Sequence, residues 1–324
     1  MIADLQRFKG ECAGTVGASI DRKLKSVFTE EIAQQTKHFC RYYLQGDMTT
    51  SSSAAAMTSV FQPDTETMKQ VVQGSMTYAK YLVAAHQKLF PGSNAECFEL
   101  CGGVVVYVSS TSPLTQLIGF GVTKQVLPTD FAFLRQYFHE RGLPLRIRVT
   151  QFTQPSLIEC LAGKQFKTSD FTFMLARRLD LPFNRSGHPG IEIKPIENEK
   201  LWIDTFTNGH YDGKLDEETE DLARTLFHAE RSQILGAWVD GEIAGAAMVT
   251  FTEKIAAFNA GCTLPAFRGM GIQKALIEHR IDLAAKNGLN LAMSRISPGS
   301  ISHRNYTKLG FNIGYFTMLL EEIA

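Results

Sequence analysis

The sequence predicts an α/β protein whose mixed sheet is built from two similar halves, the first of them preceded by helices. Strand patterns alternate with helical patterns from Cys97 onward, and the two halves end on similar segments. A Pro- and Gly-rich stretch without apolar periodicity, Asp180 to Gly190, lies between them. The total of 324 residues also suggests two domains, which we place at 1–185 and 190–324.

The composition is that of an ordinary globular protein. Hydrophobic residues make up 44% and charged residues 20% of the chain, which excludes a wholly disordered protein. The 33 basic and 33 acidic residues balance, so we expect no nucleic-acid partner and no membrane partner. The composition does not exclude a local basic patch. Because no apolar run approaches the ~20 residues of a spanning helix and the N-terminus has no apolar signal core, we expect a cytoplasmic protein.

The cysteines indicate neither a disulfide framework nor a metal site. No pair has C-x-x-C spacing, and Cys97 and Cys101 have no histidine or further cysteine nearby at zinc-site spacing. Six cysteines in a chain of this length are typical of free thiols in a reducing compartment. They are Cys12, Cys40, Cys97, Cys101, Cys160 and Cys262.

The first half is predicted to begin with helices. Residues 1–45 read as helical and residues 49–59 as a loop, and the 3–4-residue spacing of Met68, Val72 and Met76 predicts a helix over 66–89. The β-branched run from residue 97 to 110 predicts one strand, and 114–122 a second. A helix then begins at Thr129 or Asp130 and ends at Gly142. A strand (145–152), a short helix (from 155) and a strand (170–179) complete this half.

The second half is predicted to repeat this order after an additional strand and two helices. A strand from Ile191 precedes helices over 200–207 and 217–230. Asp240-Gly241 between two apolar segments predicts a β-hairpin. The remaining elements are a strand (255–264), a helix to Lys286, a strand (291–297), a helix (303–309) and a final strand to Leu320.

Two pairs of segments suggest that the halves arose by duplication. Residues 142–166 align with 288–311 with one gap, and Phe171 to Leu175 then matches Tyr315 to Leu319. The alternative is that any strand-rich α/β chain gives such matches. The halves differ after the central strand, where only the second has a glycine-rich turn.

That turn, Pro265 to Lys274, has the chemistry of an anion site. Two glycines one residue apart, Gly269 and Gly271, open a helix, and free backbone N–H groups at a helix N-terminus attract phosphate. Arg268 and Lys274 add positive charge. The turn is neither a Walker A loop, which requires G-K-[ST], nor a dinucleotide fingerprint, which requires a third glycine.

With the downstream segment Tyr306-Thr-Lys-Leu-Gly-Phe311, the turn P-x-x-R-G-x-G-I resembles the GCN5-related N-acetyltransferase (GNAT) superfamily over about residues 190–324. The resemblance implies two GNAT-like mixed-sheet α/β halves, a degenerate first one and an acyl-CoA-binding second one. It implies acetyl-CoA or another acyl-CoA as donor, with its pyrophosphate on the turn.

The family pattern R/Q-x-x-G-x-G/A falls on Arg268, Gly271 and Gln273, and Gln273 departs from the usual Gly or Ala. The family's splayed strand, which pairs with pantetheine and whose backbone holds the oxyanion, maps to Cys262, Thr263 and Leu264. A family Asn is replaced by Gly299, so Ser300 or Ser302 is expected to make its contact. The implied cofactor set is Cys262, Thr263, Leu264, Arg268, Gly269, Met270, Gly271, Ile272, Gln273, Lys274, Ser300 and Ser302.

Several side chains keep two interpretations. Tyr306 matches the tyrosine that protonates the departing thiolate, or it packs in the core. The segment from Asn208 to Gly213 lines the acceptor site or is an ordinary loop. Asn259 stands where the family often has a carboxylate, so a water-mediated base is the expectation. His303 and His279 are interpreted as structural, and Cys262 as an inert buried thiol rather than an acyl carrier.

We therefore expect an N-acetyltransferase that moves an acetyl group directly from acetyl-CoA to a primary amine of a small molecule. The alternative is a non-catalytic acyl-CoA-binding sensor or assembly subunit. A homodimer is possible on this sequence. The acceptor itself is not specified, because acceptor contacts lie on variable loops.

Overall fold

The computed structural model describes residues 64–323, so the helices expected in 1–45 and the loop at 49–59 lie outside the described residues. The first half confirms the predicted order of helices and strands, with one strand more. Its elements are α4 (Thr65–Leu89), β1 (Glu96–Leu100), β2 (Gly103–Tyr107), β3 (Gln116–Ile118), α5 (Pro128–His139), β4 (Arg146–Thr150), α6 (Pro155–Leu161) and β5 (Phe166–Arg178).

The second half follows the predicted order throughout. Its elements are β6 (Ile191–Pro195), α7 (Glu199–His210), α8 (Glu217–Phe227), β7 (Ser232–Val239), β8 (Glu242–Phe251), β9 (Ile255–Thr263), the 3₁₀ turn η1 (Pro265–Phe267), α9 (Ile272–Lys286), β10 (Leu291–Ile296), α10 (Ile301–Lys308) and β11 (Asn312–Glu322).

Two tight turns have the same geometry in the two halves. Asp240 and Gly241 both have positive φ (50° and 83°), which is the backbone of the predicted hairpin turn. Cys101 and Gly102 have φ of 46° and 73°, so the segment expected as one strand from residue 97 is a hairpin instead. The strand expected over 114–122 is also shorter, because only Gln116–Ile118 pairs.

The start of α5 differs by one or two residues from the prediction. Its N-cap is Leu127, and Pro128 occupies the first helical position. The Asp130 carboxylate still caps the helix, because Oδ2 accepts a hydrogen bond of 2.9 Å from the Leu127 N–H. The predicted capping residue Asp130 therefore lies in the first turn of the helix, and its carboxylate accepts a hydrogen bond from the residue that precedes the helix.

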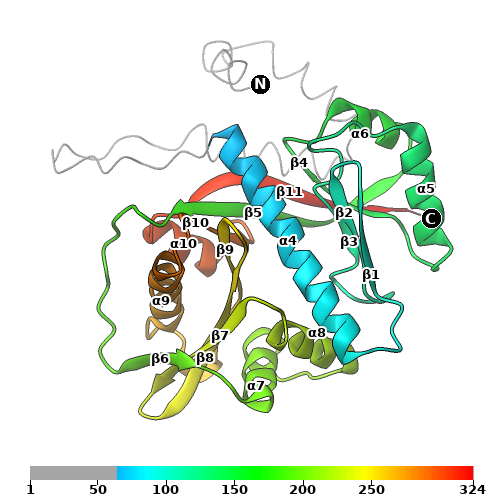
Figure 1. Ribbon diagram of the computed structural model, residues 1–324. Coiled ribbons are helices and arrows are strands. Elements are labelled where there is room, and N and C mark those ends of the chain that lie inside the picture. Colours follow the sequence, from blue (N-terminus) through cyan, green and yellow to red (C-terminus); the bar gives the residue numbers. More distant parts are fainter. Residues whose placement is uncertain (1–63, 324) are drawn as a thin grey trace.

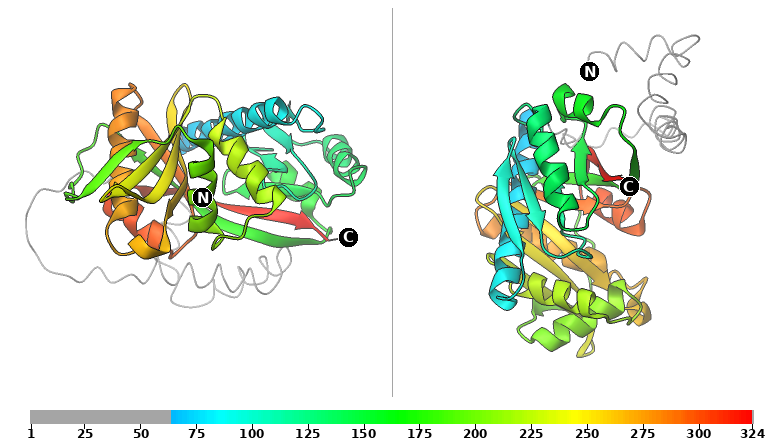
Figure 2. Two further views of the ribbon diagram at one scale, coloured as in Figure 1. Left: turned by 90° about the horizontal axis from the view of Figure 1, so that it is seen from below. Right: turned by 90° about the vertical axis from the view of Figure 1, so that its right-hand side faces the viewer.

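All strands belong to one 11-stranded sheet in the order β1-β2-β3-β4-β11-β5-β10-β9-β8-β7-β6. Alternating residues face opposite sides: Met174 and Ala176 of β5 pack with α4, whereas Phe173 and Leu175 pack in the cluster of α9 and α10. By the same alternation, α7 and α8 share the face of α4, and α5 and α6 share the other (Figure 1). Figure 2 shows helices on both faces of the sheet.

The two halves exchange their last strands. β5, from the first half, pairs with β10 of the second, while β11 pairs with β4 of the first. β5 and β11 also pair with each other, antiparallel, at the centre of the sheet. The halves predicted from the sequence therefore share strands in one continuous sheet, with residues 181–190 crossing between them.

The β5–β11 pair has local two-fold symmetry, which supports the predicted duplication. Thr172 pairs directly with Thr317, and their hydroxyls are 3.2 Å apart. Ser169 and Gly314, each left unpaired by a register shift, both lie three residues before the central threonine of their strand. The symmetry relates Thr172 to Thr317, one residue away from the sequence match of Phe171 with Tyr315.

Helix α4 packs across both sets of strands, as Figure 1 shows. Its buried face carries Met68, Val72 and Met76, the residues whose spacing predicted the helix, and Asp64 caps its N-terminus by accepting from the Thr67 N–H at 2.7 Å. This face contacts β2 of the first half and β9 of the second. One apolar surface thus holds the two halves together.

We predict that the described part of the chain unfolds in a single transition despite its two-part sequence. Ile147→Ala in the first half and Leu276→Ala in the second each remove a side chain that is at most 1% exposed. Each substitution should lower the free energy of unfolding by about 2–5 kcal/mol, as measured by urea denaturation. Two transitions, each shifted by only one of the variants, would show independently folding halves.

Candidate active site

The glycine-rich turn leaves the N-terminus of α9 open. Gly269 and Gly271 both have φ of 87°, a left-handed conformation that favours glycine. Gly271 is the N-cap, and no side chain of residues 64–323 bonds to the first N–H groups of this 15-residue helix. These N–H groups and the positive end of the helix dipole form a place for an anion.

Strands β9 and β10 separate beside this helix. Their parallel pairing covers only Leu291↔Ile255, Ala292↔Ala256 and Met293↔Ala257, and β10 then pairs only with β5. The Ser294 hydroxyl donates to the Phe258 carbonyl at 2.9 Å at the point of divergence. Beyond it, β9 has β8 on one side and no strand of the described chain on the other, so its polar backbone groups face a gap.

Two of the three residues assigned to the splayed strand lie on this stretch of β9. Cys262 pairs with Ala246 and Thr263 with Gly245 of β8, and the Leu264 N–H donates to the Ala244 carbonyl just after the strand ends. The Cys262 side chain is 5% exposed and points away from α9, toward α7. Its thiol lies 3.6 Å from the Thr205 carbonyl.

The end of α7 packs against an irregular point of β9. Ala260 has φ of 49°, within a register shift between β8 and β9. Gly209 is required there, because a Cβ would lie 2.5 Å from Cys262 Cβ. Desolvation lowers the pKa of His210, and an interaction with the Ala260 backbone raises it by less. Of the segment Asn208 to Gly213, Gly209 and His210 lie against β9.

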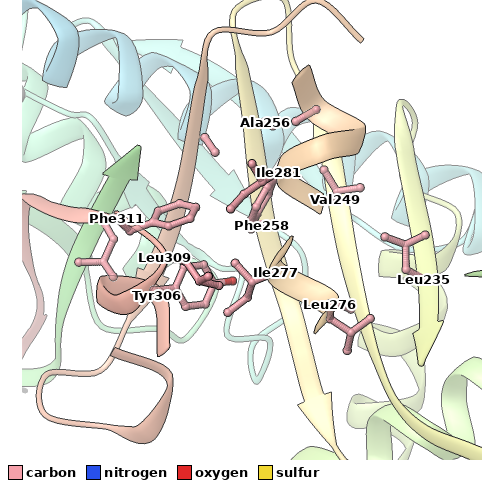
Figure 3. Close-up of a cluster of buried hydrophobic side chains, with 14 of the residues drawn as sticks. Leu235, Val249, Ala256, Phe258, Leu276, Ile277, Ile281, Tyr306, Leu309 and Phe311 are labelled. Carbon is pink, nitrogen blue, oxygen red and sulfur yellow. The ribbon is translucent and has the colours of Figure 1, made fainter. Parts of the chain in front are cut away.

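Tyr306 lies in the core between α10 and α9. It is 3% exposed and packs edge-to-face on Phe311 (Figure 3). Its hydroxyl oxygen accepts from Arg280 Nη2 at 3.1 Å, so its own O–H proton is available to another acceptor. Arg280 is 1% exposed, donates to the Leu276 and Met248 carbonyls, and forms no ion pair within residues 64–323. No pattern in the sequence indicated this buried cation.

Gln273 connects the start of α9 to α10. Its Nε2 donates to Ser302 Oγ and its Oε1 accepts from Asn305 Nδ2, both at 2.7 Å. Ser300, the other serine assigned to the cofactor, caps α10 by accepting from the His303 N–H at 3.0 Å. The Gln273 side chain is thus directed to α10.

A segment that sequence analysis treated only as a linker runs along α9. Arg185 forms two hydrogen bonds with Asp282 (2.7 and 2.6 Å), and Ser186 contacts both Glu278 and Lys274. His188 reaches the N-cap, since a Cβ on Gly271 would lie 3.2 Å from its Nδ1. Arg268 and Met270 are exposed on the turn, and Ile272 is buried below it.

The other polar residues considered from the sequence have separate positions. Asn259 lies on β9 with its Nδ2 buried and without a hydrogen-bond partner. His303 accepts from the Gly299 N–H at 3.2 Å and packs on Phe173, and His279 is half-buried on α9. Within residues 64–323, Cys97, Cys101, Cys160 and Cys262 are free and no cluster suited to a metal ion is found.

Among residues 64–323, none of the helices combines the length and the apolar character needed to cross a bilayer.

Comparison with known proteins places this geometry in a family. Residues 197–311 match the acetyltransferase (GNAT) family, a range that includes β9, the turn, α9 and Tyr306. No curated protein sequence matches the chain.

Solved structures resemble the chain in fold at low sequence identity. A GCN5-related N-acetyltransferase from Kribbella flavida is 14% identical with a TM-score of 0.54, and the match covers 76% of this chain and 96% of that one. An acetyltransferase of the GNAT family from Colwellia psychrerythraea is 12% identical with a TM-score of 0.48, covering 79% and 97%. A tandem GNAT protein from the clavulanic acid biosynthesis pathway is 14% identical with a TM-score of 0.45, covering 60% and 67%. The first match extends well beyond residues 197–311, so the fold of both halves has a solved counterpart.

We predict that Cys262 does not react with thiol reagents in the folded protein. Burial raises the pKa of this thiol to about 11, so it stays protonated at pH 8 and out of contact with solvent. Iodoacetamide at pH 8, followed by peptide mass spectrometry, should modify Cys262 only after denaturation. Rapid alkylation of Cys262 in the native protein would instead support a nucleophilic role.

Proposed function

Residues 197–311 form a domain of the GNAT acetyltransferase family, and we propose that this protein transfers an acetyl group directly from acetyl-CoA to a primary amine of a small molecule. The observation that carries the proposal is the uncapped α9 N-terminus beside the gap between β9 and β10. An anion cradle next to a free strand edge suits a donor that has both a pyrophosphate and amide groups.

The donor would lie along the turn and β9. The N–H groups of residues 269–274 would bind the pyrophosphate, with Arg268 and Lys274 contributing charge. The free edge of β9 as far as Leu264 would pair with the amides of the pantetheine arm. The residues fit this role because Gly271 keeps the cradle free of a Cβ and because Gln273 is held on α10.

The donor supplies a thioester, whose carbonyl carbon is attacked by the amine. Backbone N–H groups of β9 can stabilise the negative charge that develops on the acyl oxygen. Tyr306 would then donate its proton to the sulfur, because Arg280 already holds the phenolic oxygen as an acceptor and leaves the O–H free. A thiol has a pKa of ~8.5, so this proton transfer needs only modest assistance.

Direct transfer fits the thiols of this chain. Cys262, on the strand beside the gap, is buried under α7 and is not placed to carry an acyl group. The free cysteines of residues 64–323 are compatible with a reducing compartment, and we propose the cytoplasm as its location.

The pyrophosphate cradle predicts a specific effect of Arg268. Arg268→Ala should weaken acetyl-CoA binding by roughly ten- to a hundredfold, as expected for loss of a charge-assisted hydrogen bond, measured by calorimetry. Lys254→Ala, which removes an exposed cation from the turn between β8 and β9, is the matched control and should bind as the unchanged protein does. If Arg268→Ala binds acetyl-CoA as tightly as Lys254→Ala does, Arg268 does not contact the donor.

Tyr306 allows catalysis to be separated from binding. Tyr306→Phe should lower kcat by at least about tenfold, since it removes the general acid, and leave the Kd for acetyl-CoA within about twofold. A variant that binds acetyl-CoA normally and keeps its full rate would reduce Tyr306 to a packing residue. If the unchanged protein binds acetyl-CoA but no amine is acetylated, a non-catalytic acyl-CoA sensor is the better description.

A further inference from the structure

A small cavity lies on the sheet face that carries α4, opposite the face covered by α9. We call it the α4 cavity; its volume is about 90 Å³. The polar side chains that matter are Tyr78 of α4, Asn259 of β9, Arg295 of β10, Arg148 of β4, and Thr317 and Tyr315 of β11. Two arginines line this cavity and no Asp, Glu or Lys does.

The two arginines occupy equivalent positions about the β5–β11 symmetry. Arg148 pairs across the strands with Leu319, and Leu319 pairs with Asp170. Arg295 pairs with Met174, and Met174 pairs with Tyr315. When Thr172 is matched to Thr317, Met174 corresponds to Leu319 and Asp170 corresponds to Tyr315. Arg148 and Arg295 are therefore equivalent, and each half contributes one of them to the cavity.

The symmetry is broken at the counter-ion. Arg148 is 7% exposed and bonds to Asp170 at 3.0 Å, Gln116 at 2.7 Å and Thr317 at 2.8 Å. The position equivalent to Asp170 holds Tyr315, a phenol whose pKa is raised by burial and which stays uncharged at neutral pH. The Arg295 side chain forms no ion pair and no hydrogen bond with any of residues 64–323.

The cavity therefore carries an excess of positive charge. Burial, followed by the charge of Arg295, lowers the pKa of Arg148 to about 10, so Arg148 still bears its charge at neutral pH. Among residues 64–323, Asp170 is the only carboxylate that pairs with an arginine of the cavity, and it pairs with Arg148. In this part of the chain, the exposed guanidinium of Arg295 is left without a partner of opposite sign. A ligand carboxylate at Arg295 would stand in for the carboxylate that the second half lacks.

An unpartnered hydrogen-bond donor lines the cavity near the end of the β9–β10 pairing. Asn259 Nδ2 is buried and has no hydrogen-bond partner, although buried polar groups are normally paired. Asn259 lies just past Ala257, where the β9–β10 pairing ends. The gap through which the thioester would be reached thus adjoins the cavity.

We propose that the α4 cavity is the acceptor site and that the acceptor is a small primary amine that also bears a carboxylate, the carboxylate binding Arg295 beside Arg148. This inference rests on the proposed acetyl transfer. The amine enters as an ammonium, loses one proton to solvent and attacks the thioester carbon. The C–N bond forms first and the C–S bond of the tetrahedral adduct then breaks. Tyr306 gives its proton to the thiolate, and the second amine proton replaces it on Tyr306. The carboxylate is unchanged, and a polycationic amine would be repelled.

The test compares amines that differ only in the carboxylate. Free CoA release is measured at saturating acetyl-CoA with glycine against methylamine and with β-alanine against ethylamine. The kcat/KM should be higher for the carboxylate-bearing member of each pair by roughly ten- to a hundredfold. Equal values in both pairs, or a preference for the amines without a carboxylate, would overturn the proposal.

Variants of the exposed Arg295 identify the group responsible. Arg295→Met should abolish the preference while acetyl-CoA binding by calorimetry is unchanged, and Arg295→Lys should retain part of it. Arg231→Met, at an exposed arginine outside the cavity lining, should behave as the unchanged protein does. A preference that survives Arg295→Met contradicts the assignment.

Two further outcomes separate this inference from the proposed function. If the unchanged protein does not bind acetyl-CoA, the proposed function fails, and the acceptor assignment fails with it. If it binds acetyl-CoA but calorimetry of that complex detects neither glycine nor β-alanine at millimolar concentration, the proposed function stands and the acceptor assignment is overturned.

Discussion

The antiparallel pairing of β5 with β11 is the constraint on which the rest of the structure depends. It joins the last strands of the two halves around the Thr172–Thr317 pair, at the centre of the sheet. Because each strand also pairs with the other half, neither half can complete its part of the sheet alone. The apolar face of α4 then covers strands of both halves. Separation into two independent domains would expose backbone hydrogen-bonding groups and apolar surface together.

This exchange gives the two halves different roles at one site. The second half provides the open N-terminus of α9, the free edge of β9 and the Tyr306–Arg280 pair. The first half lacks the glycine-rich turn, yet its strand β4 brings Arg148 to the cavity under α4. Under the proposed function, the first half would thus contribute to acceptor recognition without a donor site of its own. Tyr315 stands at the position symmetric to Asp170, so the Arg295 side chain has no carboxylate partner among residues 64–323.

Buried arginines without a carboxylate partner recur around the proposed reaction centre. Arg280 is satisfied by carbonyls and by the Tyr306 hydroxyl, and its charge lies over the ring of Phe258 at 4.7 Å. Arg177 likewise donates to the Leu309 carbonyl. These cations link α9 and α10 to each other and to the sheet through hydrogen bonds rather than ion pairs.

The sequence by itself determined the local structure and the character of the donor site. Helical periodicity, the Asp240-Gly241 turn and the glycines of the α9 turn act over a few residues, so patterns such as Met68, Val72 and Met76 were sufficient. Only the tertiary structure decided the strand exchange, the one-residue shift that aligns Thr172 with Thr317, and the convergence of Arg148 with Arg295. It also placed His188 over Gly271 and Arg280 against Tyr306. These features depend on pairing and packing between residues far apart in the chain, and periodicity does not record which strand becomes the neighbour of which.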